Sequence, residues 1–349
     1  MRVQARQVFS FAQAGDLGWQ GDWRNQVNHG LDYIARYGLD DHGYLRGQIG
    51  ADGRPVETPP DLYDQAFYLL ALAHSFRVTG APKYRRLALD LLHNLRRDFS
   101  HSLGGFLDTP VNRERLRANP HMHLLEAALA WVEISDAEVW RELATEIAEL
   151  CQDRLIDRRI GALLEYFNAD WSPVDVGSLA YIEPGHQFEW CWLLTRYEGL
   201  VGEVDASVYR TLFEIGEQNG VCPQRGVAID ELRRDLTWKQ GQARLWPQTE
   251  RLKAAVALAQ MSSGADRSIH LAQAREAVAG LGLYFTGVPK GLWRDKLLQD
   301  GSFVDEPVPA SSFYHIVHAI AELARSDLDV GRQGAESKAS LKLVEPAFR

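Results

Sequence analysis

Residues 61–80, DLYDQAFYLLALAHSFRVTG, decide the fold class of this chain. Their apolar side chains recur at spacings of three and four residues, which is the period of an α-helix. Thr58 and the two prolines after it form a helix-start signal, and Gly80 is a helix-stop signal. Because apolar residues cover nearly every side of this segment, it predicts a helix that is buried all round.

Similar apolar segments recur at a nearly constant interval along the chain. They predict helices that begin near residues 3, 60, 120, 185, 247 and 311. More polar segments follow the first five, and they predict amphipathic helices near 22–37, 82–98, 137–153, 205–219 and 266–282. A glycine-led segment that is suited to a short hairpin then follows each pair, as in GALLEYF at 161–167 and GVAIDEL at 226–232.

This repeat of about sixty residues predicts an all-α fold, an (α/α)6 barrel with short β-hairpin loops between helix pairs. Residues 1–326 are expected to form one barrel domain, and residues 327–349 a C-terminal tail. The pattern yields eleven helices, so one outer helix is missing. We expect it either before Met1 or in the tail, although the glycine and serine of the tail disfavour a helix.

Composition narrows the class of partner. The chain has 349 residues, of which 46% are hydrophobic, and a formal net charge of -9 without a run of Lys or Arg. Such a charge disfavours nucleic acids and anionic membranes as partners and favours a small, roughly neutral molecule. Three cysteines without metal-site spacing, no signal peptide and no apolar span of about 20 residues predict a cytoplasmic protein.

Polar residues gather in the first turns of the apolar helices. These helices alternate with outer helices, so they run parallel, and their first turns are expected to share one mouth of the barrel. The polar residues in those turns are Arg6, Asp64 with Gln65, Asn119 with His123 and Glu126, His186 with Glu189, Arg244 with Trp246, Gln248 and Glu250, and Ser312 with His315.

These residue types suit proton transfer on a sugar. The positive end of a helix dipole disfavours a protonated imidazole, so His186 is expected to be a neutral base, and Glu189 to fix its tautomer. His186 and His315 come from different helices and could exchange protons on opposite sides of a substrate. Trp246 could stack against a sugar ring. Candidate ligands of its hydroxyl and carbonyl oxygens are Arg6, Asn119, Arg244 and Gln248.

Simpler structural roles compete with these assignments. Asn119 could act only as a helix cap, Trp246 could belong to the core, and a single buried histidine is often structural. His121 and His123 are two residues apart, so their rings point away from each other on a helix, and no metal site is expected. Nucleotide-binding loops are also absent from the sequence, so no cofactor is expected.

Five segments resemble the N-acylglucosamine 2-epimerase superfamily, which comprises N-acylglucosamine 2-epimerases, cellobiose 2-epimerases and mannose isomerases on (α/α)6 barrels. They are VQARQVFSFA (3–12), NPHMHLLEA (119–127), IEPGHQFEW (182–190), RLWPQTERLKA (244–254) and ASSFYHIV (310–317). The resemblance implies proton transfer without a metal, with His186 and His315 as the catalytic pair and Glu189 supporting His186. It also implies that Arg6, Asn119, His123 and Trp246 contact the substrate. Members usually carry one more helix ahead of the first motif, which would account for the missing outer helix.

The expected function is therefore isomerisation of an aldose to a ketose, of the mannose to fructose type, through a cis-enediolate. Return of the proton to C1 gives the ketose, whereas return to C2 from the opposite face gives a 2-epimer. The alternative is thus a 2-epimerase acting on N-acylglucosamine or on a cellobiose-type disaccharide. The residues leave open which histidine takes the C2 proton and whether the sugar is phosphorylated, although a free sugar is preferred. A monomer or a homodimer is expected.

Two further classes compete with an isomerase. An inverting glycoside hydrolase on the same barrel would use two carboxylates roughly 6.5–9.5 Å apart, drawn from Asp64, Glu126, Glu189 and Glu250. A sugar-binding scaffold without catalysis would bind the sugar but exchange no proton with solvent.

Overall fold

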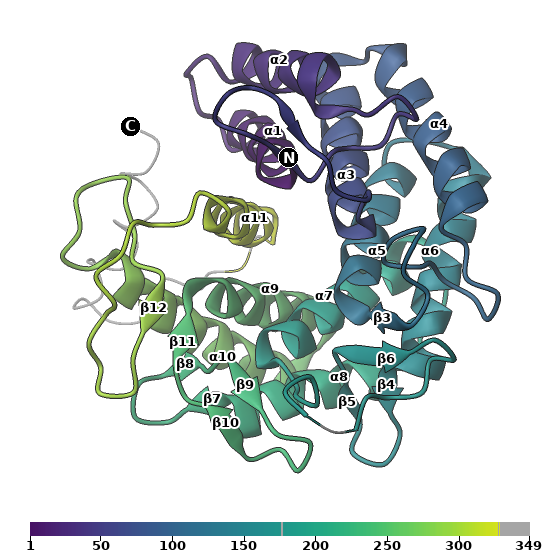
Figure 1. Cartoon of the computed structure of the whole chain (residues 1–349). Coiled ribbons are helices and arrows are strands. Elements are labelled where there is room, and N and C mark those ends of the chain that lie inside the picture. The colour runs from purple at the N-terminus through teal and green to yellow at the C-terminus, as the bar shows by residue number, and fades with distance from the viewer. Residues whose placement is uncertain (176, 327, 329–349) are drawn as a thin grey trace. The chain divides into compact units, whose positions relative to one another are not determined.

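The computed structural model describes residues 1–175, 177–326 and 328, which form two compact units (Figure 1). Unit 1 comprises Met1–Asp157, Leu164–Ala180 and Arg196–Glu203. Unit 2 comprises Arg158–Leu163, Tyr181–Thr195 and the described residues from Val204 onward. The prediction that residues 1–326 form a single domain stays a prediction, and nearly all of the predicted tail lies outside the described residues.

The described residues contain eleven α-helices, as the periodicity predicts. The helices of unit 1 are α1 (Arg2–Asp16), α2 (Trp23–Tyr33), α3 (Leu62–Thr79), α4 (Pro82–Asp98), α5 (Ala118–Val132) and α6 (Glu138–Leu150). Unit 2 holds α8 (Ala206–Ile215), α9 (Leu245–Met261), α10 (Gly264–Gly282) and α11 (Ser312–Arg325). Helix α7 (Pro184–Leu200) begins in unit 2, and its last residues are counted in unit 1.

Short turns and strands connect these helices. Five-residue π-helical turns extend α2, α6 and α8, namely η1 (Ile34–Gly38), η2 (Cys151–Leu155) and η3 (Gly216–Gly220), and a 3₁₀ turn, η4 (Leu283–Phe285), follows α10. The strands are β1 (Gln48–Ile49), β2 (Pro55–Val56), β3 (Arg115–Arg117), β4 (Ile156–Asp157), β5 (Ala162–Leu163), β6 (Tyr166–Asn168), β7 (Val221–Cys222), β8 (Val227–Ala228), β9 (Glu231–Leu232), β10 (Trp238–Gln240), β11 (Ala243–Arg244) and β12 (Lys296–Leu297). Antiparallel pairs such as β7 with β8 confirm the predicted hairpin loops.

The two kinds of helix differ in burial as their sequences predict. Helix α3 is buried on nearly all sides, whereas α4 buries one stripe made of Tyr84, Ala88, Leu91, Leu92 and Leu95. In unit 1, α3 lies beside both α1 and α5, and α2, α4 and α6 each pack on the helix that precedes them (Figure 1). In unit 2, α9 packs against α10 and α11.

Two helix starts differ from the sequence prediction. Asp61, and not Thr58, caps α3, because its carboxylate accepts a hydrogen bond from the Tyr63 N–H at 2.9 Å. Prolines 59 and 60 keep the intervening backbone extended, which delays the helix. Helix α5 begins at Ala118 with Arg117 in the capping position. Asn119 therefore lies inside the first turn and is not the N-cap.

A glutamine in the first turn fastens each of three buried helices to a hairpin. Its amide oxygen accepts from a hairpin N–H, and its amide nitrogen donates to the C=O of the same hairpin residue. The pairs and their two distances are Gln65 with Leu45 (2.7 and 2.9 Å), Gln187 with Leu163 (2.9 and 3.1 Å) and Gln248 with Ala228 (2.7 and 2.8 Å). The nitrogen also donates to the C=O four residues earlier in each helix.

His121 fastens α5 to a hairpin in a similar way. Its Nε2 accepts from the Phe106 N–H at 3.0 Å, and its Nδ1 lies 3.0 Å from the Arg117 C=O. Burial disfavours the charged ring and lowers the pKa of His121 to about 4. The His121 ring is therefore neutral and has a structural role. Its partners differ from those of His123, as the two-residue spacing predicts. We call Gln65, His121, Gln187 and Gln248 the helix pins.

Arginines at two helix starts add a second fastening. The Arg117 side chain pairs with Asp61 at 2.7 Å and with Asp108, and its N–H donates to Asp108 at 3.1 Å. Arg244 repeats the arrangement with Glu183 and Asp230 at 3.4 and 3.3 Å, and its N–H donates to Asp230 at 2.8 Å. The starts of α3, α5, α7 and α9 are thus held by both ion pairs and hydrogen bonds.

Replacement of a helix pin should destabilise the fold. Gln187→Leu removes the partners of the buried Leu163 N–H and C=O, and should lower the free energy of unfolding by about 2–3 kcal/mol. The measurement is urea denaturation followed by circular dichroism. Gln26→Leu, at an exposed position of α2, is the matched control and should change stability by no more than about 0.5 kcal/mol. Equal effects of the two substitutions would contradict the role of the pin.

Candidate active site

In unit 1, Arg6 of α1 is held against two rings of α3. Its side chain is buried, and Nη2 donates to the Tyr63 hydroxyl at 2.6 Å. The guanidinium lies 4.1 Å from the centroid of the Phe67 ring. A cation over an aromatic face is attracted by the ring, so α3 fixes the direction of this arginine.

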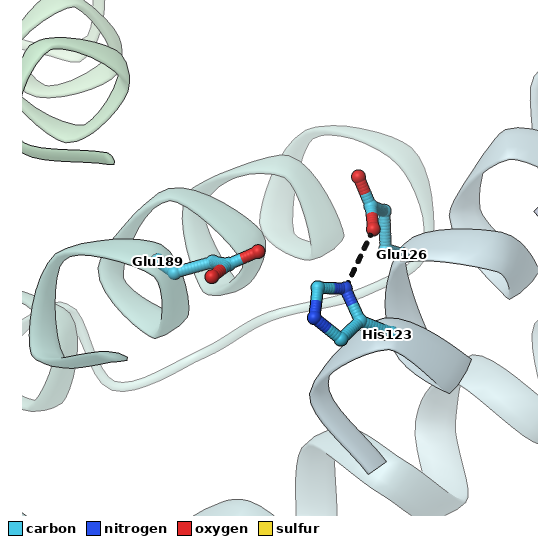
Figure 2. Close-up of side chains that lie close together, drawn as sticks. All are labelled: His123, Glu126 and Glu189. Carbon is cyan, nitrogen blue, oxygen red and sulfur yellow. Dashed lines mark hydrogen bonds and ion pairs between the residues drawn. The ribbon is translucent and has the colours of Figure 1, made fainter. Parts of the chain in front are cut away.

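His123 of α5 lies beside the same two rings. Its Nδ1 is 3.0 Å from an oxygen of Glu126, one turn later on the helix, and both side chains are buried (Figure 2). The ring centroids of Phe67 and Tyr63 are 4.4 and 5.0 Å away. The carboxylate favours a proton on Nδ1, so the neutral ring carries its acceptor lone pair on Nε2. Asn119 is half-buried one turn before His123.

In unit 2, Trp246 brings the two predicted catalytic histidines into one neighbourhood. Its ring centroid lies 5.1 Å from that of His186 and 5.7 Å from that of His315. These residues come from the first turns of α9, α7 and α11, which are three separate helices. Both imidazoles are largely buried, at 5% exposure for His186 and 7% for His315.

Gly185 permits the close approach of Trp246 to α7. A Cβ atom at this position would lie 2.4 Å from the indole ring, well inside van der Waals contact. The glycine before His186 therefore has a packing reason: only a residue without a side chain lets the ring lie against the first turn of α7.

His315 is held by a carboxylate of α9. Its Nδ1 lies 2.8 Å from an oxygen of Glu250, and the other oxygen of Glu250 lies 2.6 Å from the Lys253 ammonium. Burial opposes ionisation of Glu250, but the charges and hydrogen bonds of Lys253 and His315 outweigh it and hold the pKa of this carboxyl below its usual range. An ionised Glu250 favours a proton on Nδ1 of His315, so Nε2 is the nitrogen able to accept a proton.

Of the remaining predicted site residues, Glu189 lies beside a candidate catalytic histidine, whereas Gln248 and Arg244 are bound to the protein framework. Glu189 lies one turn after His186 on α7, and both side chains are buried, as the spacing predicts. Gln248 is a helix pin whose two amide N–H groups are spent on the Ala228 and Arg244 carbonyls. These bonds make Gln248 part of the framework, and its predicted contact with the substrate stays a prediction. Arg244 is tied to Glu183 and Asp230, although a third of its side chain stays exposed.

The sequence analysis did not single out Lys253. It placed Glu250 among the polar first-turn residues and gave it one specific role, as a candidate carboxylate of a hydrolase. The available signal was a Glu and a Lys three residues apart in a helix that is otherwise apolar on that side. Such a pair is expensive to bury unless each charge has a partner.

Comparisons with known proteins identify the family and the fold of the chain. The family model described as N-acylglucosamine 2-epimerase matches residues 1–319. A protein of Rhizobium meliloti (strain 1021) named mannose-6-phosphate isomerase is 46% identical over 328 residues, which cover 92% of this chain and 84% of the relative. A solved D-mannose isomerase has a TM-score of 0.84 at 19% identity and covers 93% of this chain and 87% of its own. A cellobiose 2-epimerase from Bacillus thermoamylovorans B4167 has a TM-score of 0.81 at 17% identity, covering 93% and 87%.

The fold class is therefore the all-α (α/α)6 barrel, as predicted. The chain belongs to the N-acylglucosamine 2-epimerase family, so it is a carbohydrate isomerase or epimerase that acts on a small sugar. None of the helices in the described part of the chain is long and apolar enough to cross a lipid bilayer.

A methyl group at position 185 should disturb the site while leaving most of the fold intact. Gly185→Ala would push the Trp246 ring away from His186, and we expect kcat/KM to fall at least about tenfold. The measurement is steady-state kinetics on the sugar that the wild-type protein converts. Gly199→Ala on the same helix, where a Cβ would meet no atom within 4 Å, is the control and should leave kcat/KM unchanged. Full activity of Gly185→Ala would show that the position of the indole is unimportant.

Proposed function

We propose that this protein is an aldose–ketose isomerase that interconverts a mannose-type hexose with its ketose through a cis-enediolate. One observation carries the proposal: Trp246 contacts two histidines from different helices, and one of these, His315, has its Nδ1 bound to an ionised carboxylate. In the proposed site, Trp246 would supply an apolar surface for a sugar ring, with the two imidazoles beside it.

The proposed reaction moves one proton from C2 to C1 of the open-chain sugar. His315, oriented by Glu250, accepts the C2 proton at Nε2, and the electrons of the broken C–H bond form the enediolate. His186 exchanges the hydroxyl proton during ring opening and between O1 and O2. The protonated His315 exchanges this proton with solvent and then delivers a proton to C1, which gives the ketose and restores the neutral imidazole, so no external oxidant or reductant is consumed.

The family resemblance extends the proposed substrate contacts beyond these residues. On that basis we propose that Glu189 supports His186, and that Arg6, Asn119 and His123 bind sugar oxygens. Arg244 is a further candidate because its guanidinium lies 5.5 Å from the ring centroid of Trp246. An arginine placed near a developing enediolate oxygen would contribute roughly 3–4 kcal/mol to transition-state stabilisation. The fixed direction of Arg6 over Phe67 is consistent with such a preorganised donor.

The names of the relatives support a mannose-type substrate and raise the question of phosphate. We propose a free hexose, because Arg117 and Arg244 are already paired with carboxylates, which would repel a phosphate dianion. The 6-phosphate of the same sugar is the second candidate. It is favoured by the name of the Rhizobium relative and by the exposed guanidinium groups of Arg113 and Arg115 before α5.

A glycoside hydrolase is less well supported by the carboxylates. A hydrolase needs a general acid whose pKa is raised, whereas the pKa of Glu250 is lowered. Burial raises the pKa of Asp64, but this carboxyl is paired with Arg2 at 3.1 Å, and Glu126 is bound to His123. A 2-epimerase is better supported, since His186 and His315 both contact Trp246 and two bases are what epimerisation requires.

One experiment separates these possibilities. D-Mannose, mannose 6-phosphate, N-acetylmannosamine and cellobiose are incubated with the protein in deuterated water, and the products are followed by NMR. We expect D-fructose with deuterium at C1 from D-mannose. A C2 epimer with deuterium at C2 would instead identify an epimerase, conversion of the phosphate alone would identify the second candidate, and binding without exchange would exclude both activities.

The histidine roles are tested by substitution. His315→Asn and His186→Asn should each lower kcat by about 10²–10⁴-fold, because each removes a proton-transfer group. The assay is the rate of D-mannose conversion together with the rate of deuterium uptake. His42→Asn, in an exposed loop, is the control and should behave as the wild type. Near-normal turnover in both site variants would refute the assignment.

A further inference from the structure

Lys253 of α9 is a charged side chain with no exposed surface. Its ammonium lies 2.6 Å from Glu250, whose side chain is also fully buried, and 3.9 Å from the ring centroid of Trp192 on α7. Removing both charges from water costs several kcal/mol per ion before their attraction is counted. A hydrophobic residue would fill this position at lower cost, so the charge itself requires an explanation.

Glu250 joins this lysine to the proposed base. One carboxylate oxygen contacts Nδ1 of His315 and the other contacts Nζ of Lys253, so imidazole, carboxylate and ammonium form a line of three groups. With a neutral His315, the net charge of the line is zero. Without the ammonium it would be -1, and a buried anion beside His315 would favour the protonated imidazole.

We propose that Lys253 is a positioning residue that acts through Glu250: it balances the carboxylate so that His315 stays neutral, with Nε2 ready to accept a proton, near neutral pH. This inference rests on the proposed function, in which His315 is the base. Glu250 contacts both Lys253 and His315, so the effect of Lys253 is exerted by charge through this intermediate carboxylate.

Other ionisable groups of unit 2 lie around His315 and the residues that contact it. On α11, Tyr314 lies beside it at 4.8 Å between ring centroids, and His318 follows one turn later. From α7, His186 lies on Trp246, which also contacts His315. Asp295, which precedes β12, is bound to Ser312 at the start of α11. The Glu322 carboxylate accepts from Trp192 at 3.1 Å and pairs with Arg325 at 2.8 Å, so partners of its own hold that charge.

The charge balance predicts opposite effects of two substitutions on the pH profile of kcat/KM. Lys253→Met leaves the anion unbalanced, so His315 should hold its proton more tightly and the acidic limb should move to higher pH by about one unit or more. Glu250→Gln leaves the cation unbalanced, so the acidic limb should move to lower pH. The double variant Glu250→Gln with Lys253→Met is neutral again, and its limb should return close to the wild-type position.

A direct titration makes the test independent of turnover. The Cε1 signal of His315 is followed by ¹³C NMR against pH and is assigned by its loss in His315→Asn. It should shift in the same directions as the kinetic limbs. If the wild-type protein converts no sugar but the titration shifts as described, the proposed function fails while the charge balance stands. If sugar is converted and the titration does not shift, only the inference about Lys253 fails.

The pH profile distinguishes a loss of charge balance from simple structural damage. A lysine that serves only packing would lower kcat or the melting temperature without moving the limb, and the losses of the two single variants would add in the double variant. Lys83→Met, at an exposed position of α4, controls for the change in net charge and should leave the limb in place. If Lys253→Met does not fold, the charge-neutral double variant decides: a wild-type limb supports the inference, and a limb displaced as in Glu250→Gln overturns it.

Discussion

The hydrogen bonds that fasten the first turn of a buried helix to a hairpin are the constraint on which the rest of the structure depends. A helix buried on all sides has no amphipathic stripe to fix its rotation, so packing alone would leave its orientation poorly determined. The pins Gln65, His121, Gln187 and Gln248 remove this freedom, because each one satisfies a buried hairpin residue only when the helix has one orientation. They also pair backbone groups that would otherwise be buried without partners.

The candidate active site is built on the residues next to the pins. Gln187 follows His186, and Gln248 lies two residues after Trp246, so fixing the pin also fixes the neighbouring side chain. Gly185 then lets the indole lie against α7, and Glu250, one turn further into α9, reaches His315. The framework and the proposed chemistry therefore share the same first turns. This arrangement explains why glutamine and histidine occur together in segments that are otherwise apolar.

Much of the fold could be predicted from the sequence, because the signals for it are local. Helix periodicity, prolines at helix starts and glycines at helix ends can all be recognised from neighbouring residues. These signals predicted the start of each buried helix within about two residues of its position in the structure. The spacing of His121 and His123 likewise showed that their rings point apart. Residue types alone could not separate Gln248, which is a helix pin, from Trp246, which is a candidate site residue. Both occur in the same first turn, and either could contact a sugar.

The sequence by itself determined the repeat, the fold class and the short set of residues from which the proposed chemistry is drawn, since these depend on contacts within one helix or hairpin. Only the tertiary structure decided what each polar side chain contacts: that the amide of Gln248 is spent on Ala228, that Trp246 meets both His186 and His315, and that Glu250 carries Lys253 on its second oxygen. The physical reason is that a hydrogen bond or a buried charge pair depends on distances of about 3 Å between elements far apart in the chain, and no local pattern encodes those distances.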